Sequence, residues 1–153
     1  MNVTAESIAV EREIAIQARP ETVWELLVDP EQAVRWMGLH AEFDLRPGGG
    51  YSVEVIPGHT ARGEFVEIDP PRRLVYTWGW EGASTVPPGS TTVEFELVAT
   101  AEGTLLRFGH RGLPDAQAAA SHTHGWEHYL ERLGALAAGG DPGRDPWIDG
   151  PEK

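Results

Sequence analysis

Apolar and polar residues alternate along much of the first two thirds of the chain, which predicts β-strands. Between residues 8 and 16 the apolar side chains share one parity, with Arg12 as the exception, and this is typical of a strand with one buried face. The same period of two recurs between turns rich in proline and glycine and predicts about six more strands. Their spacing indicates an antiparallel meander. These strands are expected at residues 43–46, 51–55, 61–68, 74–80, 92–99 and 104–111.

Two short helices are predicted between the first and second strands. Pro20 is tolerated in the first turn of a helix and Glu21 suits the positive end of its dipole, so an amphipathic helix should run to Val28. Asp29-Pro30 breaks this helix and starts a second one that ends near Gly38.

The last regular element should be a long helix over about residues 114–138, where apolar side chains recur at spacings of three and four. Glu127, Glu131 and Arg132 are expected to face away from this apolar stripe, and Gly139-Gly140 should end the helix. The stripe consists of Ala119, His122, Trp126, Tyr129, Leu130, Leu133 and Leu136.

Together these elements predict an α+β fold in which a bent antiparallel sheet of about seven strands wraps around the long C-terminal helix. A single helix leaves a gap against a curved sheet, and such gaps commonly hold apolar ligands. We expect an N-terminal arm over residues 1–7, a single domain over residues 8–138 and a tail over residues 139–153. The tail is rich in Pro, Gly and Asp, so it should be mobile, with Trp147 either docked on the domain or bound to a partner.

Composition and charge exclude several classes of partner and of functional site. The chain of 153 residues is 41% hydrophobic and shows neither a secretory signal nor a run of about 20 apolar residues, so we expect a cytoplasmic protein that does not bind membranes. Twelve basic against 24 acidic residues give a net charge of -12, which disfavours nucleic acid as a partner. The absence of cysteine excludes disulfides, zinc–thiolate sites and cysteine nucleophiles.

Large aromatic side chains on the inward parities are the first candidates for a functional site. They either fill a packed core or form the flat apolar walls of a cavity. Trp24 is expected to pack the first helix on the sheet. The residues predicted to line a ligand cavity are Trp36, Tyr51, Val53, Trp78, Trp80, Phe95, Phe108, His110, His122, Trp126 and Tyr129.

Two residues are candidates for catalysis, His110 and Glu64. His110 on the last strand should face His122 on the long helix, either as hydrogen-bonded core residues or as a pair that orients a ligand or transfers protons near neutral pH. Glu64 shares its parity with Val66 and Ile68. It is therefore either a buried base with a raised pKa or an exposed carboxylate at the strand edge.

No metal or cofactor is expected. His124 and His128 are four residues apart on the helix, a spacing that can chelate a metal, but a third ligand is not evident. The chain shows no nucleophile elbow, phosphate loop or dinucleotide fingerprint. The glycines at 48–50 lie between two strands and open no helix, so they are not a phosphate-binding loop.

Several short motifs occur together along the chain. They are Arg19-Pro20-Glu21-Thr22-Val23-Trp24, Asp29-Pro30-Glu31, Arg35-Trp36-Met37, Arg46-Pro47-Gly48-Gly49 with Tyr51, Gly63, Glu67-Ile68-Asp69-Pro70-Pro71-Arg72-Arg73-Leu74, Tyr76-Thr77-Trp78, Thr92-Val93, Gly103-Thr104, His110, Gly112, and Gly125-Trp126 with Tyr129, Leu130 and Leu133. In combination they resemble the family of activator of heat-shock-protein-90 ATPase homologue-like domains, within the START-like or SRPBCC superfamily. The likeness covers about residues 8–138.

This resemblance implies the helix-grip fold and the binding of a small hydrophobic or aromatic molecule, by a domain that we expect not to be an enzyme. One alternative is a cyclase- or hydrolase-like enzyme, because some members of the superfamily are catalysts whose cavity residues do not transfer between families. Another is a protein-interaction module, either co-chaperone-like or a homodimer. The name-giving eukaryotic protein stimulates the chaperone through an additional N-terminal domain, for which this chain has no room, so the chaperone role is the weaker expectation.

Overall fold

The computed structural model describes residues 8–149 and contains seven strands, three α-helices and a final 3-10 helix. The N-terminal arm expected at residues 1–7 and the last four residues of the tail lie outside the described residues. The elements are, in order, β1 (Ile8–Ile16), α1 (Pro20–Val28), α2 (Pro30–Ala33), β2 (His40–Phe43), β3 (Gly50–Ile56), β4 (His59–Asp69), β5 (Arg73–Trp78), β6 (Thr91–Ala99), β7 (Thr104–Leu113), α3 (Ala116–Ala137) and η1 (Pro146–Asp149).

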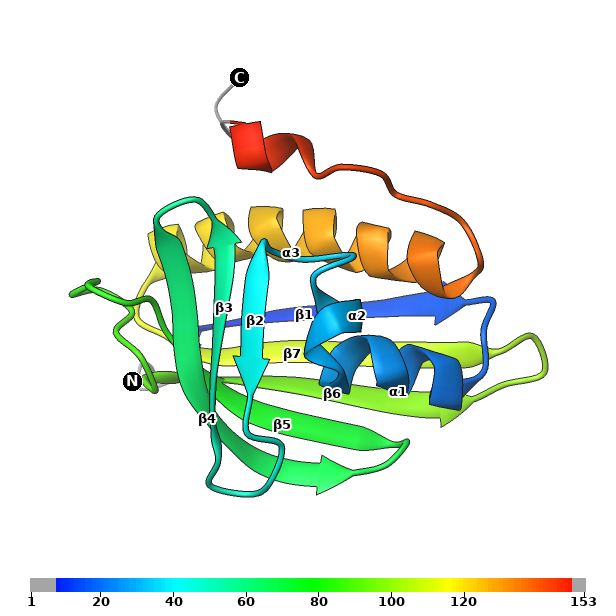
Figure 1. Ribbon diagram of the computed structural model, residues 1–153. Helices are drawn as coiled ribbons and strands as arrows, with labels where there is room; N and C mark the ends of the chain where they lie inside the picture. Colours follow the sequence, from blue (N-terminus) through cyan, green and yellow to red (C-terminus); the bar gives the residue numbers. More distant parts are fainter. Residues whose placement is uncertain (1–7, 150–153) are drawn as a thin grey trace.

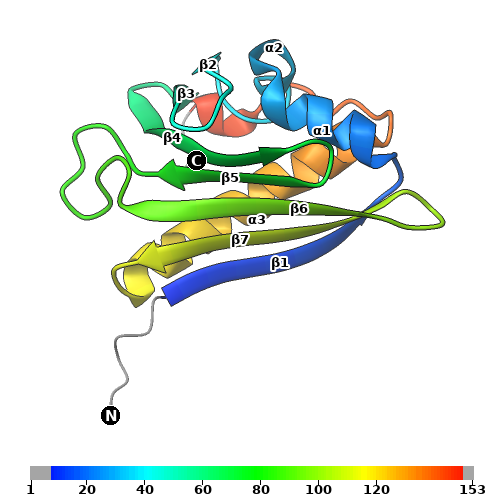
Figure 2. The ribbon, with the colours of Figure 1, turned by 90° about the horizontal axis from the view of Figure 1, so that it is seen from below.

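The seven strands form one antiparallel sheet in the order β1-β7-β6-β5-β4-β3-β2. The sheet is strongly bent, so that β2, β3 and β4 stand in front of the remaining strands (Figure 1). Seen from below, α3 crosses the concave side of the sheet behind β6 and β7 (Figure 2). The predicted α+β fold, with a long C-terminal helix and two short helices after the first strand, is confirmed.

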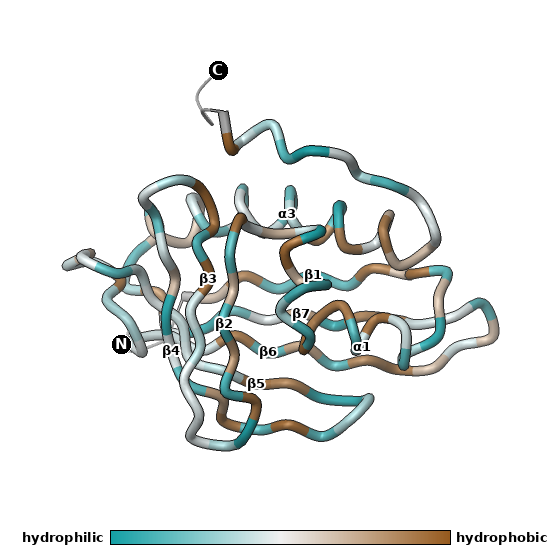
Figure 3. The backbone as a smooth tube through the Cα atoms, viewed as in Figure 1, coloured by the Kyte–Doolittle hydropathy of each residue, from teal (hydrophilic) through white to brown (hydrophobic). Residues whose placement is uncertain are grey.

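One face of each central strand supplies the core, as the period of two requires. Val93, Phe95 and Leu97 of β6 are buried, whereas Glu94 and Glu96 between them are not. The alternation is visible as brown and teal segments along β6 (Figure 3). From the other side, Leu130 and Leu133 of α3 complete this core. The inward parity of the predicted strands therefore holds for the centre of the sheet.

The two short helices close one end of the sheet. Pro20 occupies the start of α1, and the buried side chains of Val23 and Trp24 pack it against the core. The turn after α2 reaches β2 through Gly38, which has a φ of +93° and lies so close to the backbone of Glu54 that a Cβ there would meet its oxygen at 2.8 Å. Glycine is required at this position because other residues are strained in that conformation.

Several boundaries and orientations differ from the predictions. The strand expected at residues 43–46 lies earlier, at β2, and β5 ends at Trp78, leaving Trp80 in an isolated bridge with Ala61. Arg12 on the inner parity of β1 reaches Glu127 of α3 at 2.5 Å, which accounts for the exception in the apolar pattern. Arg132 does not simply face away, because its guanidinium donates hydrogen bonds to backbone carbonyls on two neighbouring segments.

No helix within residues 8–149 is long and apolar enough to cross a membrane.

Candidate functional site

A cavity of about 670 Å³ opens where the bent side of the sheet meets the middle of α3. Its size lies within the range of pockets that hold small organic ligands. Exposed His59 and Glu81 belong to its rim, so the cavity communicates with solvent. The lining residues are Met37, Val55, Ile56, His59, Trp78, Trp80, Glu81, Gly82, Ala83, Ser121, His122, His124, Gly125, Trp126, Tyr129 and Trp147.

Five of the eleven residues predicted to line a cavity do line this one: Trp78, Trp80, His122, Trp126 and Tyr129. They come from the end of β5, the bridge residue Trp80 just after it, and one face of α3. Trp78 and Trp126 lie against each other with ring centroids 5.2 Å apart, and Trp80 meets Trp78 edge-on at 5.3 Å. These rings give the cavity wall flat aromatic surfaces, and all three were among the residues predicted from the sequence to line a cavity.

The other six predicted residues pack in the core. Trp36, Tyr51, Val53 and Phe95 border an interior space of only about 20 Å³, which is about the room of one water molecule. Trp36 Nε1 donates to the Leu26 carbonyl at 2.8 Å and the Tyr51 hydroxyl donates to the Thr77 carbonyl at 2.6 Å. The polar atoms of these rings are therefore used to hold the fold together. Phe108 and His110 lie behind Trp126 and do not line the cavity.

His110 is fully buried and both of its ring nitrogens are occupied. Trp126 Nε1, which can only donate, gives its hydrogen to Nδ1 at 2.9 Å. Nε2 must then carry the proton and donate it to the Thr91 hydroxyl at 2.8 Å, which in turn donates to the Trp78 carbonyl. Burial and the neighbouring His122 lower the pKa of His110 to about 3. As a catalytic base His110 is therefore poorly placed: no free nitrogen is directed at the cavity.

His122 stands on the cavity wall, and its ring centroid lies 5.0 Å from that of His110. The sequence thus predicted correctly that the two residues face each other. Nδ1 of His122 donates to the Ala118 carbonyl at 2.8 Å, and Nε2 accepts from Trp80 Nε1 at 3.0 Å. Burial lowers the pKa of His122, against the smaller opposing effect of the bond to Ala118. The residue is thus a neutral, hydrogen-bonded part of the wall.

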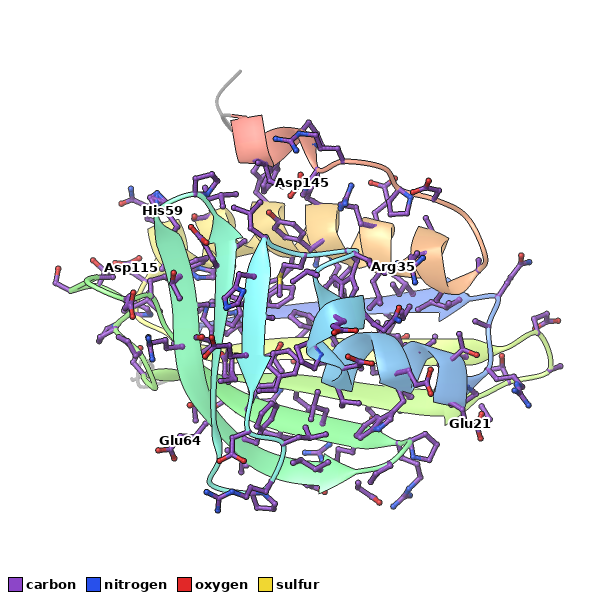
Figure 4. All side chains as sticks on the ribbon, viewed as in Figure 1. Glu21, Arg35, His59, Glu64, Asp115 and Asp145 are labelled. Carbon is purple, nitrogen blue, oxygen red and sulfur yellow. The ribbon has the colours of Figure 1, made fainter. Side chains whose placement is uncertain are left out.

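Glu64 does not enter the cavity. It is exposed on the outer face of β4 and points away from the molecule (Figure 4). The pairing of β4 with β5 shifts between Phe65 and Glu67, so one extra residue interrupts the alternation there. Ile68 packs on the core while Val66 is 54% exposed. The parity argument for Glu64 was wrong because it counted across this bulge.

The tail provides one wall of the cavity and docks on α3. Trp147 stacks on His128 with ring centroids 3.9 Å apart and also lies against His124 at 5.0 Å. His128 Nε2 lies 2.8 Å from Asp145 Oδ1. The two histidines considered as metal ligands therefore form an aromatic platform. Within residues 8–149, no three His, Cys, Asp or Glu side chains are grouped to hold a metal ion.

The hydrogen-bonding groups around the cavity are not all paired. Among the described residues, the buried Trp78 Nε1 has no hydrogen-bond partner, while Tyr129 interacts with the Asp145 carboxylate. Burial and the charge of Asp145 raise the pKa of Tyr129, so its hydroxyl keeps its proton. Buried polar atoms without partners are rare in folded proteins, and Trp78 lines the cavity.

A second groove, of about 930 Å³, lies at the opposite end of the sheet, between the β1–α1 connection, the β4–β5 turn and the β6–β7 hairpin. Its walls carry the exposed ion pairs Arg72–Asp69 and Arg73–Glu67. Charged walls of this kind are unsuited to an apolar ligand, because its binding would remove solvent from those groups. The smaller aromatic cavity is therefore the better candidate site.

A family model described as "Activator of Hsp90 ATPase homolog 1-like protein" matches residues 17–138, most of the chain. The chain belongs to this family. The AHSA1-like proteins are part of the START-like, or SRPBCC, superfamily, as the sequence motifs predicted. None of the curated proteins compared matches the chain.

Solved structures of related proteins agree with this AHSA1-like fold. An AHSA1-like protein from Rhizobium etli is 50% identical, covering 93% of this chain and 89% of its own, with a TM-score of 0.76. CalU16 from Micromonospora echinospora is 31% identical, covering 94% and 71%, with a TM-score of 0.73. A protein from Chromobacterium violaceum is 26% identical, covering 85% and 96%, with a TM-score of 0.75.

Some residues of this AHSA1-like cavity were not predicted from the sequence. Val55 shares the inward parity of Val53 and could have been found by extending the same strand. Gly125 interrupts the apolar pattern of α3, and an isolated glycine inside a helix often has a packing or functional reason. For Trp147 the sequence predicted docking on the domain or binding to a partner, but not a place in the cavity wall. For Met37 and the loop at 81–83 the sequence pattern carries no such signal.

Proposed function

We propose that this AHSA1-like domain binds a small hydrophobic or aromatic molecule in the cavity between the sheet and α3. The observation that carries the proposal is a solvent-connected space of about 670 Å³ with Trp78, Trp80 and Trp126 in its walls. Apolar contact with such walls supplies most of the binding free energy of an apolar ligand. The cytoplasm is the location that we propose, in keeping with a chain that lacks cysteine.

The chemistry of the walls favours binding without a reaction. His122 in the cavity wall is hydrogen-bonded at both ring nitrogens, and neither His110 nor Glu64, the two residues predicted as bases, lines the space. An enzyme would need a titrating or nucleophilic group with an open position toward its substrate. The domain is therefore better suited to carry, sense or sequester its ligand.

Gly125 offers a direct test, because it lines the cavity from the middle of α3 and a Cβ built there meets nothing within 4 Å. Gly125→Phe should place a ring in the empty space and raise the Kd of the fluorescent probe N-phenyl-1-naphthylamine by at least about tenfold. The fold should not suffer, since replacing a helical glycine removes an unfavourable residue worth about 1 kcal/mol. Fluorescence titration measures the affinity and urea unfolding measures the stability.

Ala135→Phe is the matched control, because Ala135 is an exposed residue of the same helix outside the cavity. It should bind the probe as the wild type does. Equal affinities of Gly125→Phe and the wild type would show that the probe binds elsewhere. Absence of probe binding, and of binding by other apolar aromatic compounds, to the wild type would count directly against the proposed function.

A further inference from the structure

The C-terminal tail beyond α3 turns back and runs along the outer side of that helix before it ends in η1 (Figure 1). Arg132 of α3 holds the first part of the tail through hydrogen bonds to the carbonyls of Pro142 and Gly143, at 3.3 and 2.9 Å. The same guanidinium donates to the Trp36 carbonyl at 3.0 Å. One side chain thus ties the tail, α3 and the turn after α2 together.

A second anchor fixes η1 above the cavity. Asp145 is only 3% exposed although it carries a carboxylate, and it lies between the tail and α3 (Figure 4). Its Oδ1 accepts from the Trp147 backbone N–H at 3.0 Å and lies 2.8 Å from His128 Nε2. Burying a carboxylate is costly unless it is hydrogen-bonded. Asp145 therefore specifies one position for the residues that follow it.

Because Asp145 fixes the start of η1, the Trp147 indole lies over the cavity. One face of the ring is nearly parallel to His128, with an interplanar angle of 9°. Its centroid also lies 5.6 Å from that of Tyr129 in an edge-on arrangement. Trp147 is half-buried and lines the same space as Trp78 and Trp126. The tail thus supplies a flat aromatic wall opposite the sheet.

This wall lies outside the part of the chain that matches the family model, which ends at residue 138. A domain cut at that point would lack Trp147, and its cavity would be wider on the side of α3 that carries His124 and His128. The tail therefore shapes the site from beyond the residues that the family model matches.

We propose that Trp147 is a ligand-contacting residue that makes the cavity selective for flat aromatic molecules over flexible aliphatic ones, and that Asp145 positions it. This inference rests on the proposed function. A rigid indole gives a planar ligand a stacking or edge-on partner, worth more than apolar area alone. A flexible chain gains only from the area that it buries, which another apolar side chain can supply equally well.

The test compares a planar probe with a flexible one on the full chain. Trp147→Leu keeps an apolar side chain over the cavity but removes the flat ring. The Kd of N-phenyl-1-naphthylamine should rise about fivefold. The Kd of 1-dodecanol should not change. It is calculated from the dodecanol concentration that displaces half of the bound probe, corrected for the affinity of each variant for the probe. Probe fluorescence measures both.

A second variant tests the positioning role. Asp145 does not line the cavity. Asp145→Ala should release the tail and weaken the planar probe about as much as Trp147→Leu does. The Trp147 amide loses its acceptor and should exchange its hydrogen at least about tenfold faster by NMR, whereas the Val93 amide in β6 should keep its rate. Asp141→Ala is the control, because exposed Asp141 caps only the Gly143 amide at 2.9 Å.

The outcomes separate this inference from the proposed function. Probe binding that is lost in Gly125→Phe but unchanged in Trp147→Leu would leave the cavity as the ligand site and overturn the role of Trp147. Equal weakening of the planar and the flexible ligand would overturn the selectivity. An unchanged affinity in Asp145→Ala, together with fast exchange of the Trp147 amide, would overturn the positioning role. A wild type that binds neither compound would overturn the inference together with the proposed function.

Discussion

Acidification should destabilise this protein through its buried histidine before most carboxylates are protonated. For His110 alone, we expect the free energy of unfolding to fall by about 2 kcal/mol between pH 6.5 and pH 5, because each pH unit in this range costs about 1.4 kcal/mol per proton. His122 changes the stability in the same direction, since its pKa is also lowered.

The sign follows from the difference between the folded and unfolded states. Burial lowers the pKa of His110 from its ordinary value of 6.5 to about 3. Between these values the unfolded chain binds a proton that the folded chain does not, so the stability is fully present above pH 6.5 and is lost as the pH falls. The structure explains the low value, because protonated Nδ1 would point its hydrogen at the Trp126 N–H.

His110→Gln separates this effect from the titration of acidic residues. The amide keeps one donor and one acceptor but does not titrate, so the slope of unfolding free energy against pH between 5 and 6.5 should become shallower by about one proton. We expect the variant to be less stable at pH 7 by about 1–3 kcal/mol, since its bonds to Thr91 and Trp126 will be imperfect. Urea unfolding at a series of pH values measures both, and equal slopes in the two proteins would contradict the explanation.

Trp126→Ala should be among the most damaging single substitutions, lowering the free energy of unfolding by about 3–5 kcal/mol. Trp126 is 3% exposed and packs on Phe108, Phe95 and Trp78 with ring centroids 4.5, 6.2 and 5.2 Å away. Its loss leaves a large hole between α3 and the sheet. It also removes the donor to His110 Nδ1, which then remains buried without a partner.

Trp126→Phe divides this loss into packing and hydrogen bonding. The phenyl ring retains much of the contact but cannot donate, so this variant should lose about 1–3 kcal/mol. Trp147→Ala is the control, because this half-buried tryptophan lies on the tail and not in the core. Chemical unfolding at pH 7 ranks the three variants. A loss in Trp126→Ala no larger than in the control would mean that Trp126 does not hold α3 on the sheet.

The order of elements could be predicted because each depends on neighbours in sequence. Pro20 and Glu21 favour the start of α1, and the alternation around Phe95 predicts β6, whatever lies elsewhere in the chain. The pairing of His110 with His122 was also predictable, since one residue is on the inward parity of its strand and the other on the apolar stripe of its helix. Local periodicity fixes which face of an element turns inward.

Predictions failed where periodicity is interrupted or where bonding depends on distant residues. The bulge near Val66 reversed the face on which Glu64 lies, and no residue type in that segment marks a bulge. The hydrogen bond from Trp126 to His110 removed a candidate base, and it joins two residues that are 16 positions apart on different elements. Neither the bulge nor this hydrogen bond can be predicted from the spacing of apolar residues.

The sequence by itself determined the family, the α+β architecture and the set of aromatic residues that face inward. Only the tertiary structure decided which of these rings fill the core and which leave a space, because the volume left over depends on how all elements pack at once. Tyr51 and Phe95 surround about 20 Å³, whereas Trp78 and Trp126 border about 670 Å³. The contribution of Trp147 is also tertiary, since Asp145 and His128 hold it at the cavity although it lies nine residues beyond the end of the family-model match.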